Sequence, residues 1–88
     1  MSDLKSSLYK TSDTALAAYL ITQGHYPLHI DYEQPRFEYS FENNNIELAQ
    51  HASKYVTGNA LVDPATYNRV FRKLSRIVRS KIQWQDEL

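Results

Sequence analysis

Five basic side chains near the end of the chain are the residues best suited to bind another molecule. They are Arg69, Arg72, Lys73, Arg76 and Arg79, which recur at steps of three or four residues and so form one cationic band on a helix. Bands of arginine and lysine neutralise the phosphates of a nucleic-acid backbone. The same band also suits an acidic protein surface, including that of a second copy of the chain, or a face that is simply solvated. The candidate partners are therefore nucleic acid, a nucleoprotein complex, a protein, or the chain itself, and we favour nucleic acid.

The usual constellations of catalytic residues are missing from the sequence. It contains no cysteine, and its two glycines are too few for a phosphate-cradling loop. Its serines do not sit in the glycine-flanked turn of a nucleophile elbow. Four acids, Asp31, Glu33, Glu38 and Glu42, fall on the polar side of an expected hairpin, where solvation explains them better than acid–base catalysis does. Contact of this acidic face with a basic partner, or mimicry of nucleic-acid charge, is a minor alternative. We expect no enzyme activity, no cofactor and no small-molecule substrate.

The three histidines do not predict a metal site. Pro27 stands between His25 and His29, so these two cannot share a regular helix face as a zinc-binding pair does. His51 has no cysteine and no paired carboxylate at ligand spacing. We expect solvated or locally hydrogen-bonded histidines and no bound metal.

Three aromatic residues have no evident place in a core, namely Tyr26, Tyr55 and Trp84. Aromatic rings beside cations can stack on bases or anchor a protein interface, and they can equally close the edge of a small core. The sequence leaves these interpretations open.

Length and composition indicate one small cytoplasmic domain. The chain has 88 residues, of which 42% are hydrophobic and 23% charged, values that argue against disorder. It has no apolar run near the roughly 18 residues that span a bilayer, and no apolar secretory signal at its start. The net charge is zero, but residues 1–63 carry four Lys or Arg against eight Asp or Glu, a net of −4, and residues 64–88 carry six against two, a net of +4. This asymmetry bears on partners more than on fold.

The cationic band must be positioned by a closing helix, which we expect between Asp63 and Gln83. Asp63 is a suitable N-cap, and Pro64 fits the first turn because its missing N–H would be unpaired there. Apolar residues recur at helical spacing at Tyr67, Val70, Phe71, Leu74, Ile77, Val78 and Ile82. One side of this helix therefore packs on the domain and the other presents cations. The link from Thr57 to Asp63 is too long for an ordinary helix-turn-helix motif.

The preceding residues predict a short strand at 8–11, a helix at 12–23 and a hairpin. The helix has the apolar face Leu16, Ala17, Leu20 and Ile21, and Gly24 ends it. The hairpin follows from strict alternation, which places on one face Leu28, Ile30, Tyr32, Phe37, Tyr39 and Phe41, and on the other the charged residues and Ser40.

A second helix follows, for which Asn44 and Glu47 resemble a capping box. Its expected buried positions are Ile46, Leu48, Ala49, Ala52, Tyr55 and Val56. The predicted order is β-α-β-β-α-α, an α+β fold in which helices cover one face of a small antiparallel sheet made of the hairpin and the N-terminal strand. We expect a flexible N-terminus at 1–7, a single domain at 8–82 and a C-terminal tail at 83–88.

Several stretches of the chain resemble one protein family. They are Tyr9–Asp13 leading into Ala15–Leu20, Gly24-His25, Arg36-Phe37 and Gly58–Asp63. In these stretches the chain is similar, over about residues 8 to 80, to small prokaryotic and phage-borne proteins known only as a domain of unknown function. The resemblance implies a phage, plasmid or other mobile-element setting and the same helix–hairpin–helix order. It assigns no catalytic or binding residue.

Overall fold

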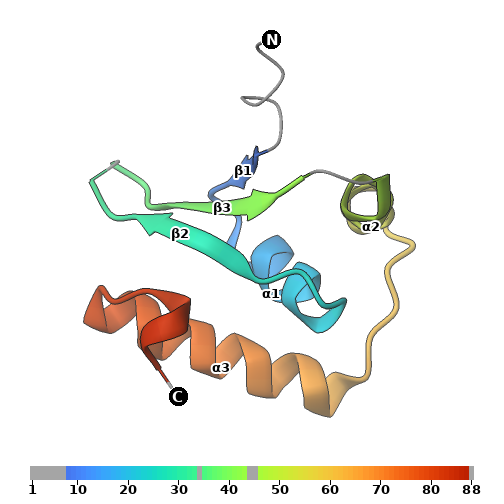
Figure 1. Ribbon diagram of the computed structural model, residues 1–88. Coiled ribbons are helices and arrows are strands. Elements are labelled where there is room, and N and C mark those ends of the chain that lie inside the picture. The colour runs from blue at the N-terminus through green and yellow to red at the C-terminus, as the bar shows by residue number, and fades with distance from the viewer. Residues whose placement is uncertain (1–7, 34, 44–45, 88) are drawn as a thin grey trace, which may run out of the picture.

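The computed structural model describes residues 8–33, 35–43 and 46–87. Its elements are strands β1 (Leu8–Thr11), β2 (Pro27–Asp31) and β3 (Glu38–Glu42), helices α1 (Thr14–Thr22), α2 (Ile46–Val56) and α3 (Pro64–Ser80), and a final 3-10 helix (Trp84–Asp86). The α+β class and the order β-α-β-β-α-α are as predicted (Figure 1). No helix in these ranges is long and apolar enough to cross a membrane.

The sheet is antiparallel with the order β1-β3-β2, so β3 is its central strand. Ser40 of β3 lies between Lys10 of β1 and His29 of β2, and it is only 8% exposed. The prediction that Ser40 faces solvent is therefore wrong, because its cross-strand neighbours Lys10 and His29 project from the same face and flank its short side chain. Strand β2 shifts register between Pro27 and His29, which breaks the two-residue alternation. As a result Leu28 is 50% exposed, and its predicted place on the apolar face is also wrong.

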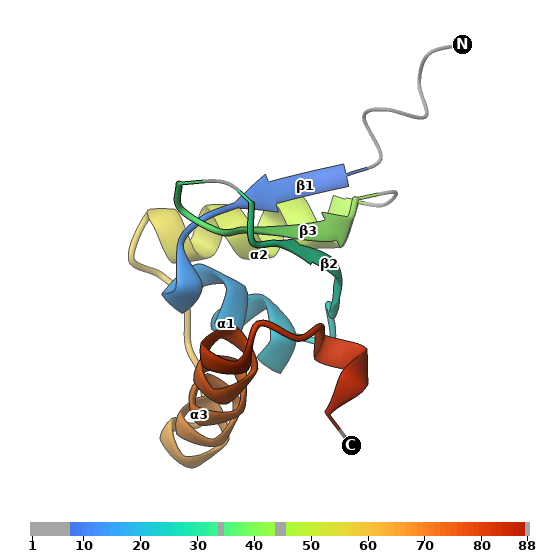
Figure 2. The same ribbon diagram turned by 90° about the vertical axis from the view of Figure 1, so that its left-hand side faces the viewer.

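Helix α1 is the centre of the molecule. It begins at the N-cap Asp13, whose carboxylate accepts hydrogen bonds from the backbone N–H groups of Ala15 and Leu16. Every residue from Leu16 to Ile21 is buried, whereas the sequence predicts only one apolar face. The reason is that α1 lies between the sheet and α3 (Figures 1 and 2). A helix enclosed in this way is apolar around most of its circumference.

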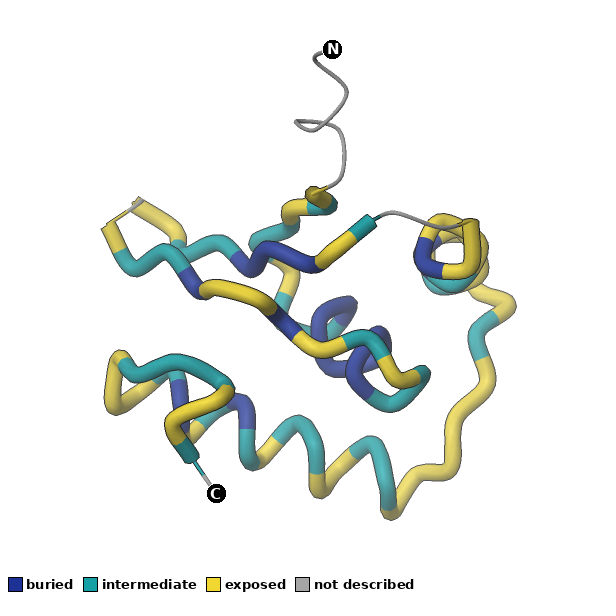
Figure 3. Tube along the Cα trace, viewed as in Figure 1, coloured by how far each residue is buried: buried dark blue, intermediate teal, exposed yellow. Residues whose placement is uncertain are grey.

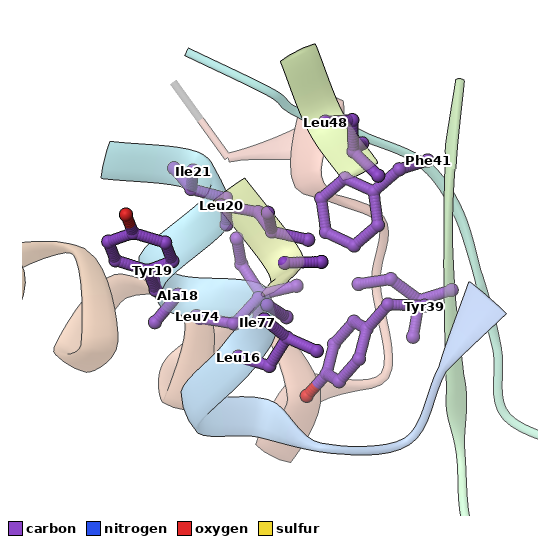
Figure 4. Close-up of a cluster of buried hydrophobic side chains, with 13 residues drawn as sticks. Leu16, Ala18, Tyr19, Leu20, Ile21, Tyr39, Phe41, Leu48, Leu74 and Ile77 are labelled. Atoms are coloured by element: carbon purple, nitrogen blue, oxygen red, sulfur yellow. The ribbon is translucent and has the colours of Figure 1, made fainter. Parts of the chain in front are cut away.

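The buried cluster in Figure 4 joins α1 to the sheet and to α3. Tyr39 and Phe41 contribute from β3, and Leu74 and Ile77 from α3. The Tyr39 hydroxyl is satisfied inside this cluster by a 2.9 Å hydrogen bond with the hydroxyl of Thr14. The apolar side of the closing helix therefore packs as predicted.

Helix α2 contributes less to the core than predicted. Leu48 and Ala52 are buried, but Ile46 is 67% and Val56 74% exposed, and Ala49 is exposed as well (Figure 3). These three predicted burials are wrong, because α2 packs beside α1 through one narrow side only. The predicted capping box at Asn44 lies outside the described residues.

The chain leaves α3 earlier than predicted and folds back on the sheet. Ser80 is the last helical residue, because Lys81 takes a left-handed conformation with φ 56°. Beyond it, the Gln83 side chain accepts a 2.6 Å hydrogen bond from the backbone N–H of Ile30 and donates one of 2.9 Å to the carbonyl of the same residue. Residues 83–87, which the sequence sets apart as a tail, thus cover the outer edge of β2.

Candidate functional site

The cations of α3 lie on the side of the helix that faces away from the core. The helix is fixed at its start by Asp63, whose carboxylate accepts hydrogen bonds from the backbone N–H and the hydroxyl of Thr66. The Thr66 hydroxyl, and then its backbone N–H, hold the pKa of the Asp63 carboxyl below its ordinary value. Arg69, Arg72, Arg76 and Arg79 are exposed and Lys73 is half-buried.

Four of the five predicted site residues line one groove of about 880 Å³. They are Arg69, Arg72, Lys73 and Arg76. The opposite wall comes from the end of α1, through Ile21 and Thr22, and from the aromatic residues Tyr26 and Trp84. Arg79 is not part of this lining. The structure thus places four cations along one concave surface and leaves the fifth outside it.

Two of the three unassigned aromatic residues meet in this groove. The rings of Tyr26 and Trp84 are stacked, with centroids 6.1 Å apart and planes inclined by 19°. The ammonium group of Lys73 lies 4.1 Å from the centroid of the Trp84 ring, within the range of a cation–π contact. The third residue, Tyr55, stacks instead on Tyr19, with centroids 6.1 Å apart.

A side chain of the C-terminal segment holds the aromatic wall in place. The side-chain amide of Gln85 donates a 3.1 Å hydrogen bond to the backbone carbonyl of Pro27, at the start of β2. This contact ties the 3-10 helix that carries Trp84 to the strand that follows Tyr26. The aromatic wall is therefore formed by Tyr26 and Trp84, which are about sixty positions apart in the sequence, whereas the cations all lie on α3.

One cation of α3 forms an ion pair within the molecule. The guanidinium of Arg76 forms a 3.0 Å ion pair with Glu87 of the C-terminal segment. Arg69 donates a long hydrogen bond of 3.4 Å to the Thr66 hydroxyl. Arg69, Arg72 and Arg79 are exposed to solvent, and none of them takes part in the ion pair of Arg76 with Glu87.

The histidines form a separate contact, away from the groove. Nε2 of His25 and Nδ1 of His51 are 3.0 Å apart, so the end of α1 is hydrogen bonded to α2. Burial, followed by the charge of His51, lowers the pKa of His25 below its ordinary value, and Glu47 opposes this shift. His29 is exposed on β2. Within the part of the chain that the structure describes, no three His, Asp or Glu side chains are grouped to hold a metal ion.

Sequence reasoning found the cations but not the opposite wall of the groove. Arginines at three- and four-residue steps are visible as a helix face from sequence alone. The wall residues Ile21, Thr22 and Tyr26 reach α3 only through tertiary packing, and no local pattern marks them. The one signal in the sequence was that Tyr26 and Trp84 had no position in the predicted core.

A family model matches most of the chain. It is described as a domain of unknown function (DUF5659), and the match covers residues 6–80. No curated protein and no solved structure matches the chain. The matched residues include all five candidate cations, while Trp84 and Glu87 lie beyond the match.

Proposed function

We propose that this chain, which belongs to the DUF5659 family of domains of unknown function, binds nucleic acid or a nucleoprotein complex through α3. The family match ends at Ser80, the last residue of that helix. The protein acts as a small, non-enzymatic accessory protein of a phage or other mobile element, in the cytoplasm. The mobile-element setting is supported by the resemblance of its Thr11–Asp13 and Gly58–Asp63 stretches to phage-borne proteins. The binding itself is supported by the geometry of the groove.

The observation that carries the proposal is the alignment of four cations along one concave surface. With a rise of about 1.5 Å per residue, Arg69 and Arg76 are about 10 Å apart along α3. The phosphates of one strand advance by about 3.4 Å per nucleotide along the axis of a duplex, so this length covers about three such steps. Contacts of this kind read the charge of the backbone and not the base sequence.

The direct test is charge reversal on α3. The double variant Arg72→Glu and Arg76→Glu should abolish binding to labelled DNA and RNA at low salt, measured by fluorescence anisotropy. The matched control reverses two exposed lysines elsewhere, Lys10→Glu and Lys54→Glu, with the same change in net charge. It should keep most of the affinity. Circular dichroism and thermal unfolding establish that both variants are folded.

Salt dependence gives a second readout of the same contact. If about three phosphates are neutralised, the affinity of the wild type should fall between about 50 and about 200 mM salt by roughly 40-fold for a duplex and roughly 20-fold for a single strand, because bound counterions are released. Failure of the wild type to bind any DNA or RNA at low salt would refute the proposal.

A protein partner is the second candidate, and exposed apolar residues favour it. Ile46, Val56 and Leu61 are 67%, 74% and 87% exposed on α2 and on the connection to α3. Large apolar side chains in such positions are common in protein interfaces. In this version the protein is an adaptor subunit or an inhibitor that makes no nucleic-acid contact. A partner retained by the wild type and lost by Leu61→Glu, together with no binding of nucleic acid, would select it.

A further inference from the structure

Resting on the proposed function, we infer that the groove binds a single strand, with an unpaired base stacked on Tyr26 while the cations of α3 hold the adjacent phosphates. The proposed function needs only charge and is indifferent to bases. The groove adds an aromatic surface directly beside that charge.

The aromatic surface is exposed and supported from behind. Tyr26 is 57% exposed, so one part of its ring is accessible to a ligand. Trp84 stacks on it with nearly parallel planes, and Lys73 lies over the Trp84 ring. A ring held in this way loses little side-chain freedom when a base stacks on it, so binding does not have to order it.

The cations of α3 lie close enough to Tyr26 to contact the phosphates of a nucleic-acid strand whose base stacks on that ring. Arg69, Arg72 and Arg76 line the same groove as Tyr26, so a base on the ring leaves its phosphates beside α3. Surfaces that bind single strands combine these two features, a cationic groove for the backbone and aromatic rings for the bases. A duplex keeps its bases paired and stacked inside, and therefore cannot use the ring.

The chain provides its own reporter for this contact. Trp84 is its one tryptophan, so the intrinsic tryptophan fluorescence comes from the groove alone. A base stacked beside the Tyr26–Trp84 pair should change this emission.

The experiment compares oligonucleotides that differ only in their bases. The probes are a thymidine oligomer of about 12 nucleotides, an abasic strand of the same length and a matched duplex, with a uridine RNA oligomer as a second base-bearing strand. We expect the base-bearing strands to change the Trp84 emission, and the thymidine oligomer to bind about fivefold or more tightly than the abasic strand.

The variant Tyr26→Ala should remove this difference, because it should weaken binding of the thymidine strand much more than binding of the abasic strand. Because Tyr26 is exposed, the variant should fold, and a purely structural effect would weaken both strands alike. Tyr26→Phe should behave as the wild type, since it keeps the ring. Leu61→Ala, which truncates an exposed apolar side chain outside the groove, should also leave the preference for bases intact.

The outcomes separate this inference from the proposed function. Equal binding of the abasic and thymidine strands would overturn base stacking and leave phosphate binding in place. Tighter binding of the duplex than of the single strand would overturn it as well. If no strand binds at low salt, the proposed function fails and the inference fails with it.

Discussion

At the scale of single residues, the charge of Arg76 is partly used within the molecule, in an ion pair with Glu87. Glu87 holds its guanidinium at 3.0 Å, while the side chain of Arg76 stays 54% exposed. An anionic ligand in the groove must compete with this carboxylate. The pair therefore tunes the affinity of the site more than it stabilises the fold, because exposed ion pairs contribute only about 0 to 1 kcal/mol.

We predict that Glu87→Gln binds polyanions roughly two- to fivefold more tightly than the wild type, which corresponds to release of one surface ion pair. Anisotropy titrations at fixed low salt measure this change. Asp86→Asn is the matched control, because it removes the neighbouring charge, which is hydrogen bonded to the backbone N–H of Gln83 and not to Arg76. Equal gains for both variants would mean that only net charge matters.

At the scale of elements, the C-terminal segment acts as a cover for the sheet. Strand β2 is an edge strand, and an edge with free N–H and C=O groups invites pairing with another chain. Gln83 meets both backbone groups of Ile30, and the Tyr32 hydroxyl donates a 2.6 Å hydrogen bond to the carbonyl of Ile82. Together these contacts fix the end of α3 against β2, and with it the position of Trp84.

Gln83→Ala should therefore lower the free energy of unfolding by roughly 1 to 3 kcal/mol, because it leaves the backbone N–H and C=O of the buried residue Ile30 without their partner. Chemical denaturation measures the loss. The control is Gln50→Ala, which truncates the same type of side chain on the exposed face of α2 and should change little. Equal stability of the two variants would show that Gln83 does not hold the edge.

The features of these elements that could be predicted from the sequence are those set by residues close together in the chain. Helix α3 follows from its cap at Asp63 and its apolar spacing, and both are local. The register shift after Pro27 and the exposure of Val56 depend on which neighbours each element meets, and no spacing reveals that. The site divides in the same way. Its cations belong to one helix and were predicted, whereas the meeting of Tyr26 with Trp84 is tertiary and was not.

At the scale of the whole molecule, the acidic and basic segments of the chain lie on different sides of the fold. The segment with net +4 is mostly α3, which lies across α1 from the sheet (Figure 2). The segment with net −4 supplies the sheet, α1 and α2. A polyanion approaching the molecule is therefore attracted to one side of it, and salt weakens this attraction over distances of about 10 Å.

The stability of the whole molecule should depend on pH through the contact between α1 and α2. Burial and the neighbouring His51 lower the pKa of His25 from its ordinary value of 6.5, so the folded state binds a proton there less readily than the unfolded chain does. Well above pH 6.5 this site is neutral in both states, and no stability is lost. As the pH falls through that value, the unfolded chain takes up the proton first, and the free energy of unfolding decreases.

Urea unfolding about one pH unit above and about one unit below this value measures the decrease. We expect His25→Gln to reduce this pH dependence, because it removes the titrating group. His29→Gln should keep the dependence of the wild type, because that histidine is exposed on β2 and lies outside the pair. A stability that stays constant in the wild type over this range, or an equal effect of the two substitutions, would contradict the role of the His25–His51 contact in holding α2 to the end of α1.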